Sequence, residues 1–130
     1  MRVLWLCNMV PGRVIGEHGK GLWMDHVLDG MLRLGVTVHV LGRGKKAASG
    51  TPEEGLSYTA FEEPVPYRYY PELEQQFGAE LKDFQPDVIL CHHLYFLASL
   101  VQELCPHIPV YGQCHGSDLR HRCRIYHPSA

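Results

Sequence analysis

Short apolar runs recur along the chain, and segments with a helical pattern separate them. Four of these runs lack the strict apolar–polar alternation of a half-exposed strand: Val3–Cys7, Val36–Leu41, Val88–Cys91 and Val110–Gln113. Strands covered on both faces have continuous apolar runs of this kind, and they are typical of parallel sheets. The pattern therefore predicts buried parallel strands.

Helical segments lie between these strands. The first, Gly21–Leu34, has apolar residues at three- and four-residue steps and stops at Gly35, a residue type that commonly ends helices. The second, Pro71–Phe84, begins with a proline, which fits the first turn of a helix, and the third spans Leu94–Leu104. This alternation predicts an α/β fold, a doubly wound, mostly parallel, Rossmann-like sheet, as one domain over residues 1–130.

The segment between the second strand and the second helix has a different composition. Gly42–Gly55 is rich in glycine, serine and charge, so we expect a long surface loop there. Ser57–Phe61 has the pattern of a weak strand, and Glu62–Tyr70 predicts a second loop.

Composition and charge exclude several classes of protein. With 130 residues, 45% hydrophobic and 20% charged, and a net charge of -2, the chain is an ordinary globular domain without general attraction to nucleic acid. No apolar run approaches the roughly 20 residues that span a bilayer, and no signal-peptide cleavage pattern follows the first strand. The odd number of cysteines, 5, indicates reduced thiols. We therefore expect a cytoplasmic protein, with peripheral membrane contact left open.

Glycines follow the first predicted strand. In an open parallel sheet, ligands bind at the carboxyl ends of the strands. Gly19, Lys20 and Gly21 stand directly before the first helix, where glycine lets the backbone approach a ligand and the helix N-terminus offers N–H donors to an anion. Their spacing matches neither the dinucleotide fingerprint nor the Walker loop. Two interpretations of these glycines stay open: contact with a phosphate or sugar, and a plain flexible connection.

Histidines follow the two later strands. Only one of His92 and His93 can face the crevice, because adjacent strand residues point to opposite faces. We favour His93, which is nearer the helix, and a structural histidine is an equal alternative. In QCHGSDLRH, Gly116 allows a sharp exit from the sheet and leaves His115 at the crevice floor, while Asp118 either caps the next turn or contacts substrate.

The carboxy-terminal residues also include possible metal ligands, which are Cys114, His115, Asp118, His121, Cys123 and His127. No C-x-x-C or H-x-x-x-H pair with a matching second pair is present, and no cysteine lies in a recognisable nucleophile turn. We therefore expect no metal site, no cofactor and no Cys/His hydrolase.

Several segments together resemble the amino-terminal domain of a GT-B glycosyltransferase of the family 4 type. They are RVLWLCN, EHGKGLWMDHVLDGMLRLGVTVHVLGRG, PDVILCHHLYFLASLV and VYGQCHGSDL. The order and spacing of these segments carry the resemblance, which covers nearly the whole chain.

The resemblance implies a retaining, metal-independent transferase that moves a sugar from a nucleotide-sugar donor to a carbohydrate or lipid acceptor. The cleft of such an enzyme lies between two Rossmann-like domains, and the amino-terminal one mainly holds the acceptor. It implies that Gly19 and Gly21 approach the donor phosphates. Family members often have adjacent glycines here, whereas Lys20 separates the two in this chain, and we expect Lys20 to add positive charge near the phosphates. It also implies that His115 contacts the donor sugar and that His93 occupies the polar position after the fourth strand.

The carboxy-terminal domain of that family, with its basic residues and paired glutamates, is missing from these 130 residues. We therefore expect a fragment that does not transfer sugar alone. The alternative is a flavodoxin-like, non-catalytic domain that binds a small ligand or a partner.

Overall fold

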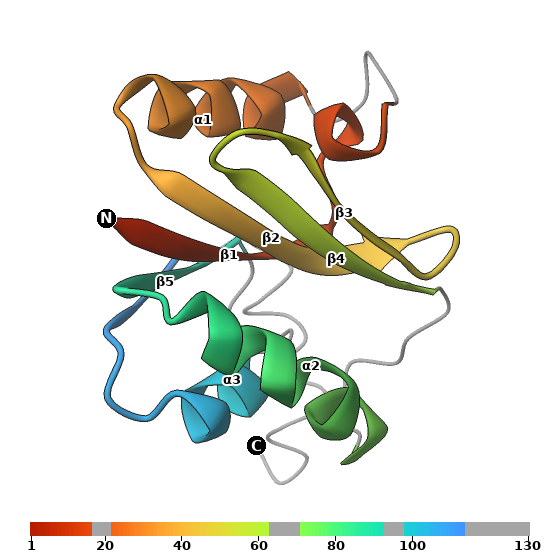
Figure 1. The fold of residues 1–130 in the computed structure, drawn as a ribbon, viewed down its shortest axis with the longest axis vertical. Coiled ribbons are helices and arrows are strands. Elements are labelled where there is room, and N and C mark those ends of the chain that lie inside the picture. Colours follow the sequence, from red (N-terminus) through yellow and green to blue (C-terminus); the bar gives the residue numbers. More distant parts are fainter. Residues whose placement is uncertain (17–21, 63–70, 93–97, 114–130) are drawn as a thin grey trace, which may run out of the picture.

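The computed structural model of the chain describes residues 1–16, 22–62, 71–92 and 98–113 (Figure 1). These residues form a six-stranded sheet in the order β3-β4-β2-β1-β5-β6. The neighbouring strands are parallel, except that β3 and β4 are antiparallel. The elements in chain order are β1 (Arg2–Met9), η1 (Gly12–Ile15), α1 (Leu22–Arg33), β2 (Thr37–Gly44), β3 (Ala48–Glu53), β4 (Leu56–Glu62), α2 (Pro71–Phe84), β5 (Val88–Cys91), α3 (Ala98–Leu104) and β6 (Val110–Gly112).

The helices cover the sheet from both sides. Helix α1 lies on one face, and α2 and α3 lie on the other (Figure 1). The crossover from β1 through α1 leads to β2 on one side of β1, whereas β5 and β6 lie on the other side. Right-handed crossovers in opposite directions place their helices on opposite faces. The predicted doubly wound, mostly parallel, Rossmann-like sheet is confirmed, and its strand order reverses between β1 and β5.

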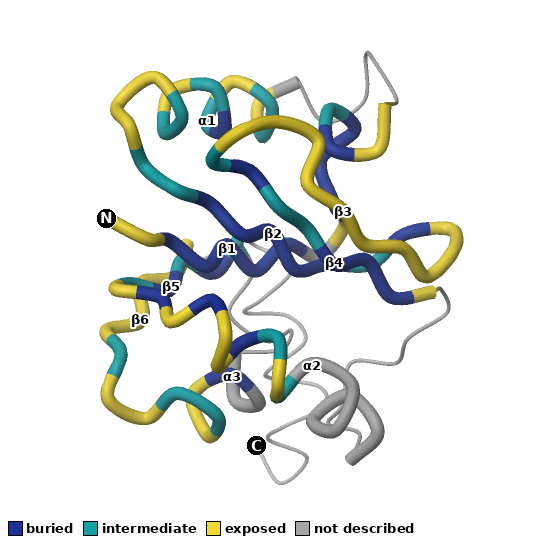
Figure 2. Tube along the Cα trace, in the orientation of Figure 1, coloured by how far each residue is buried: buried dark blue, intermediate teal, exposed yellow. Residues whose placement is uncertain are grey.

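Strands β1 and β2 are buried over most of their length (Figure 2). Leu4 and Leu6 pack in the cluster on the α2 and α3 face, whereas Trp5 and Cys7 pack in the cluster on the α1 face, which includes Leu28 of α1. Because successive strand residues point to opposite faces, a strand between two helix layers needs apolar residues at nearly every position. This explains the continuous apolar runs.

One prediction for the polar segment was wrong. We expected a surface loop over Gly42–Gly55, but β2 continues to Gly44, and β3 pairs with β4 as an antiparallel hairpin. Every residue of β3 is exposed, so this strand has no apolar pattern that the sequence could reveal. The predicted weak strand at Ser57–Phe61 is confirmed as the central part of β4.

The predicted helices agree closely with the structure. Helix α2 has the predicted bounds, Pro71–Phe84, and α1 begins and ends one residue inside Gly21–Leu34. Helix α3 confirms residues 98–104 of the third prediction, and residues 93–97 lie outside the described part, as do residues 63–70 of the second predicted loop. None of the described helices has the length and apolar character needed to cross a bilayer.

The cysteines within the described residues are free thiols, as predicted: Cys7, Cys91 and Cys105. Burial raises the pKa of Cys91 to about 11 and the pKa of Cys7 well above its ordinary value. A thiol whose pKa is raised in this way stays protonated and is a poor nucleophile. Cys114 and Cys123 lie outside the described residues.

A buried polar cluster ties α2 to the sheet. The ring of His39, in β2, is only 4% exposed, and its Nδ1 lies 2.7 Å from the Ser57 hydroxyl. Its Nε2 lies 3.1 Å from the Glu80 carboxylate of α2. The Thr59 hydroxyl donates a hydrogen bond to the same carboxylate. The cluster therefore supplies hydrogen-bond partners to polar groups that would otherwise be costly to bury.

The His39 environment predicts that stability falls in mild acid. Burial lowers the pKa of His39 from its usual value of 6.5, and Glu80 offsets that effect only in part. The unfolded chain then binds a proton more readily than the folded one. The stability contributed by neutral His39 is therefore complete above the pKa of the unfolded chain and is lost as pH falls from there through the lower pKa of the folded state. We expect the free energy of unfolding, measured by urea denaturation, to decrease between about pH 7 and about pH 5. His39→Gln should flatten this decrease.

The matched control is His107→Gln. His107 is exposed on the connection between α3 and β6, so its replacement should leave the decrease unchanged. An equally steep decrease in His39→Gln and the wild type would contradict the assignment to His39.

Gly42 of β2 lies directly beside Cys7 of β1. A Cβ atom there would lie 2.7 Å from the carbonyl oxygen of Cys7, its partner residue in β1. Because both strands are hydrogen-bonded in the sheet centre, neither can move away freely. We expect Gly42→Ala to lower the free energy of unfolding by about 1–3 kcal/mol in urea denaturation.

The control for this substitution is Gly30→Ala in α1. A Cβ at Gly30 has no neighbour within 4 Å, and alanine favours helix over glycine. This variant should be at least as stable as the wild type. If Gly42→Ala were equally stable, the close approach of β1 and β2 would be refuted.

Candidate functional site

The predicted site segments follow strands that end at the same edge of the sheet. Residues 17–21 come after β1 and η1, residues 93–97 after β5, and residues 114–130 after β6. Strands β1, β5 and β6 are adjacent and parallel. Their carboxyl ends are held together, because the His92 N–H donates to Leu6 O at 2.8 Å and the Gln113 N–H donates to Cys91 O at 3.0 Å. The segment after β5 therefore begins beside the end of β1, and the segment after β6 begins beside the end of β5.

The site residues themselves lie outside the described part of the chain. They are Gly19, Lys20, Gly21, His93, His115 and Asp118. The structure places the ends of the strands that precede them, and the convergence and contacts of these residues stay predictions.

An aromatic pair joins α1 to the end of β5. The ring of Trp23, in the first turn of α1, lies 5.3 Å from the ring of His92, centroid to centroid. Trp23 is 51% exposed, so much of its indole surface is open at the edge of the sheet. The pair lies at the point where the strand order reverses, the usual place for a ligand in such sheets. Sequence analysis missed Trp23, although it is the second residue of the helix that follows the glycine segment.

Arg13 fixes the chain just before the glycine segment. Its guanidinium, in η1, lies 2.8 Å from the Asp29 carboxylate of α1 and 2.9 Å from the Glu53 carboxylate of β3. The Arg13 backbone N–H also donates to Asp25 at 3.3 Å. Gly16 then ends η1 with a φ of 74°, a left-handed conformation that glycine adopts without strain. Helix η1 is thus tied to α1 and β3.

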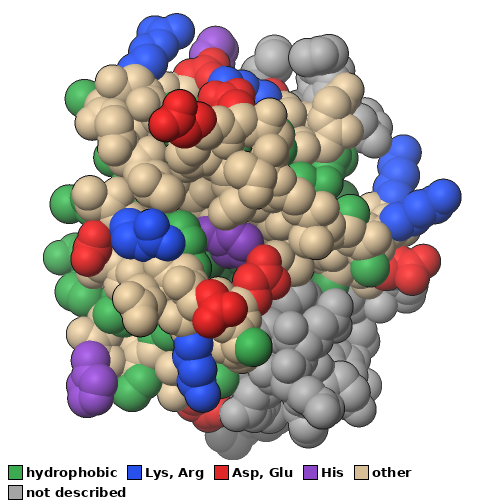
Figure 3. All heavy atoms as spheres, viewed as in Figure 1, with side chains coloured by type: hydrophobic (Ala, Val, Ile, Leu, Met, Phe, Trp, Pro, Cys, Tyr) green, Lys and Arg blue, Asp and Glu red, His purple; other side chains and the backbone are tan. Residues whose placement is uncertain are grey.

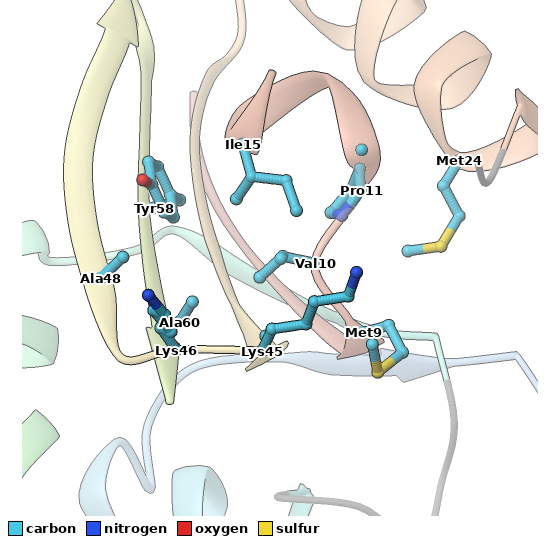
Figure 4. A pocket seen from close by; sticks show the side chains of 12 residues that line it. Met9, Val10, Pro11, Ile15, Met24, Lys45, Lys46, Ala48, Tyr58 and Ala60 are labelled. Carbon is cyan, nitrogen blue, oxygen red and sulfur yellow. The ribbon is translucent and has the colours of Figure 1, made fainter. Parts of the chain in front are cut away.

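A cavity of about 630 Å³ opens at the same edge, on the α1 side of the sheet. Its size lies within the usual range for small-molecule pockets. Figure 4 shows apolar side chains around it, with Lys45 and Lys46 from the turn after β2. The lining residues are Met9, Val10, Pro11, Gly12, Ile15, Met24, Gly44, Lys45, Lys46, Ala48, Tyr58 and Ala60. Sequence analysis missed this cavity, because part of its lining, Gly44 to Ala48, falls in the segment that was predicted as a surface loop.

Potential metal ligands do not gather in the described part of the chain. Among residues 1–16, 22–62, 71–92 and 98–113, no three His, Cys, Asp or Glu side chains lie close enough to hold an ion together.

No curated protein sequence matches this chain. The family model for Glycosyltransferase Family 4 matches residues 19–129, which is most of the chain and includes every predicted site residue. The chain is therefore an amino-terminal GT-B domain and belongs to glycosyltransferase family 4.

Proposed function

We propose that residues 1–130 form the acceptor-side domain of a retaining, metal-independent glycosyltransferase. The enzyme transfers a sugar from a nucleotide-sugar donor to a carbohydrate or lipid acceptor, and a second domain supplies the nucleotide site. Family membership supports glycosyl transfer and favours it over a flavodoxin-like binding domain. The observation that carries the proposal is the adjacency of the β1, β5 and β6 ends, from which the predicted segments depart. The free thiols support a cytoplasmic location.

The donor phosphates are assigned to the glycine segment. Gly19 and Gly21 precede α1, a helix of 12 residues. The first turn of a helix has N–H groups without an intrahelical partner. These groups and the helix dipole favour a negative charge at the helix start. As the sugar leaves, charge builds on the phosphate oxygens, and donors already in position stabilise it. Lys20 adds a positive charge beside them.

The sugar itself is assigned to the residues after β5 and β6. His115 orients a hydroxyl of the donor sugar near the reacting carbon, and His93 and Asp118 line the same space. The exposed ring of Trp23 beside His92 offers a flat apolar surface next to these segments. Aromatic faces of this kind have a large contact area and lose little conformational freedom when they bind a ligand.

His115 provides the direct test of this assignment. In the full-length enzyme we expect His115→Ala to lower kcat/KM for the nucleotide sugar by about a hundredfold, because a positioned hydrogen bond in the transition state is lost. The measurement is initial rate against donor concentration. His107→Ala, at an exposed position before β6, should leave kcat/KM unchanged.

Two results would contradict the proposal. Unchanged turnover in His115→Ala would remove this residue from the site. Sugar transfer by the isolated 130-residue chain would contradict the assignment of the nucleotide site to a second domain.

Arg13 is expected to act as a positioning residue for the glycine segment. Its ion pairs are partly exposed, so together they contribute about 1 kcal/mol, and their loss should raise the donor KM about fivefold. In Arg13→Met we expect this rise with little change in kcat, because the ground-state position of the phosphates is affected. Steady-state kinetics of the full-length enzyme measures both quantities.

Arg33→Met is the matched control. Arg33 is exposed in the last turn of α1, far along the helix from the glycine segment. The Arg33→Met variant should keep the wild-type KM for the donor. An unchanged donor KM in Arg13→Met would show that η1 does not position the glycine segment.

A further inference from the structure

The cavity beside η1 has a composition unlike that of a sugar site. Its apolar lining includes Met9, Val10, Pro11, Ile15 and Met24 (Figure 4). A carbohydrate offers many hydroxyl groups, and each one loses free energy when it is buried without a hydrogen-bond partner. Walls of hydrocarbon and thioether groups supply almost no hydrogen-bond partners. Such walls suit an apolar ligand instead.

Positive charge is concentrated at the cavity. Lys45 and Lys46 follow β2 directly and both line the cavity, where Figure 4 shows the Lys45 side chain extended along it. Basic side chains project at the edge of the molecule where the turn between β2 and β3 lies (Figure 3). Lysine commonly lays its alkyl chain along an apolar surface and keeps its amine at the rim.

Neither of these lysines has an ion-pair partner among the described residues. The contrast with Arg13, on the neighbouring η1, is clear, because Arg13 is held by both Asp29 and Glu53. The amines of Lys45 and Lys46 are thus available to an anion at the mouth of an apolar cavity.

We propose that this cavity binds an amphiphilic phosphate, with its hydrocarbon chain between η1 and the β3–β4 hairpin and its phosphate group at Lys45 and Lys46. The inference rests on the proposed function and deepens it, because it selects a lipid acceptor over a carbohydrate acceptor. Both halves of the ligand have a counterpart in the cavity: apolar walls for the chain, and two cations for a group that carries up to two negative charges.

The position of the cavity agrees with an acceptor role. Its lining includes Gly12 and Ile15 of η1, the element directly before the glycine segment assigned to the donor phosphates. It also includes Met24 in the first turn of α1. A ligand here would lie beside the predicted donor site.

Binding of dodecyl phosphate below its micelle concentration tests the proposal. Isothermal titration calorimetry with the 130-residue chain should show saturable binding at one site. Dodecyl maltoside has the same chain and an uncharged sugar head, and it should bind about tenfold more weakly or worse. Inorganic phosphate alone should give no measurable binding at the same concentration.

Substitutions in the cavity separate the two halves of the ligand. Ala48→Trp, at an exposed position on the rim, places a large side chain in the cavity and should weaken dodecyl phosphate binding at least about tenfold. Lys45→Gln combined with Lys46→Gln removes the charge at similar side-chain length and should weaken binding to the level of dodecyl maltoside. Lys82→Gln, in the last turn of α2 on the opposite face, is the matched control and should bind like the wild type.

Several results would overturn the inference. Equal affinity for dodecyl maltoside would show that the phosphate is not recognised. Equal binding of dodecyl phosphate to Ala48→Trp and the wild type would place the ligand on a charged surface outside the cavity. Equal binding of both proteins to vesicles of anionic lipid would lead to the same conclusion. Absence of binding to dodecyl phosphate would refute it outright.

Turnover of the full-length enzyme tests the proposed function separately from amphiphile binding. If amphiphile binding fails while the full-length enzyme still shows His115-dependent turnover, only the acceptor class is wrong. If the amphiphile binds but His115→Ala leaves turnover unchanged, the cavity assignment stands and the assigned role of His115 fails.

Discussion

The parallel pairing of β1 with β2 on one side and β5 on the other positions the rest of the molecule. These backbone hydrogen bonds set the register of the central strands, and the helices cover the two faces that the register creates. The approach is so close that Gly42 has no room for a side chain beside Cys7. Because β1 and β5 are parallel neighbours, their carboxyl ends lie side by side, and the segments that follow the two strands begin there.

Two polar clusters stabilise different parts of this fold. His39 and Glu80 lie between the sheet and α2, in surroundings where an unsatisfied polar group would be expensive, so their contribution is to the packing of that layer. Arg13 lies near the surface and holds η1 against α1 and β3. Its individual ion pairs are weak, but they join three elements at the entrance to the candidate site.

The sequence predicts the buried elements well, because burial leaves a pattern. Val88–Cys91 and Pro71–Phe84 have the bounds that apolar runs and flanking prolines indicated. Strand β3 was missed since none of its residues is buried, and the cavity was missed with it. The contacts of Arg13 join residues 12 to 40 positions apart, and no local pattern records such pairs. The candidate site was predictable only as a place, the carboxyl edge of the sheet; Trp23 and the lysine-lined cavity depend on how the layers assemble.

Strand β3 forms one border of the described sheet, and its composition has a consequence for solubility. All of its residues, Ala48–Glu53, are exposed, and none is a large apolar residue. Pro52 has no N–H to donate, and the register with β4 shifts between Gly50 and Glu53. A second chain approaching this border meets an interrupted ladder of donors and acceptors, so β3 disfavours edge-to-edge aggregation along this border.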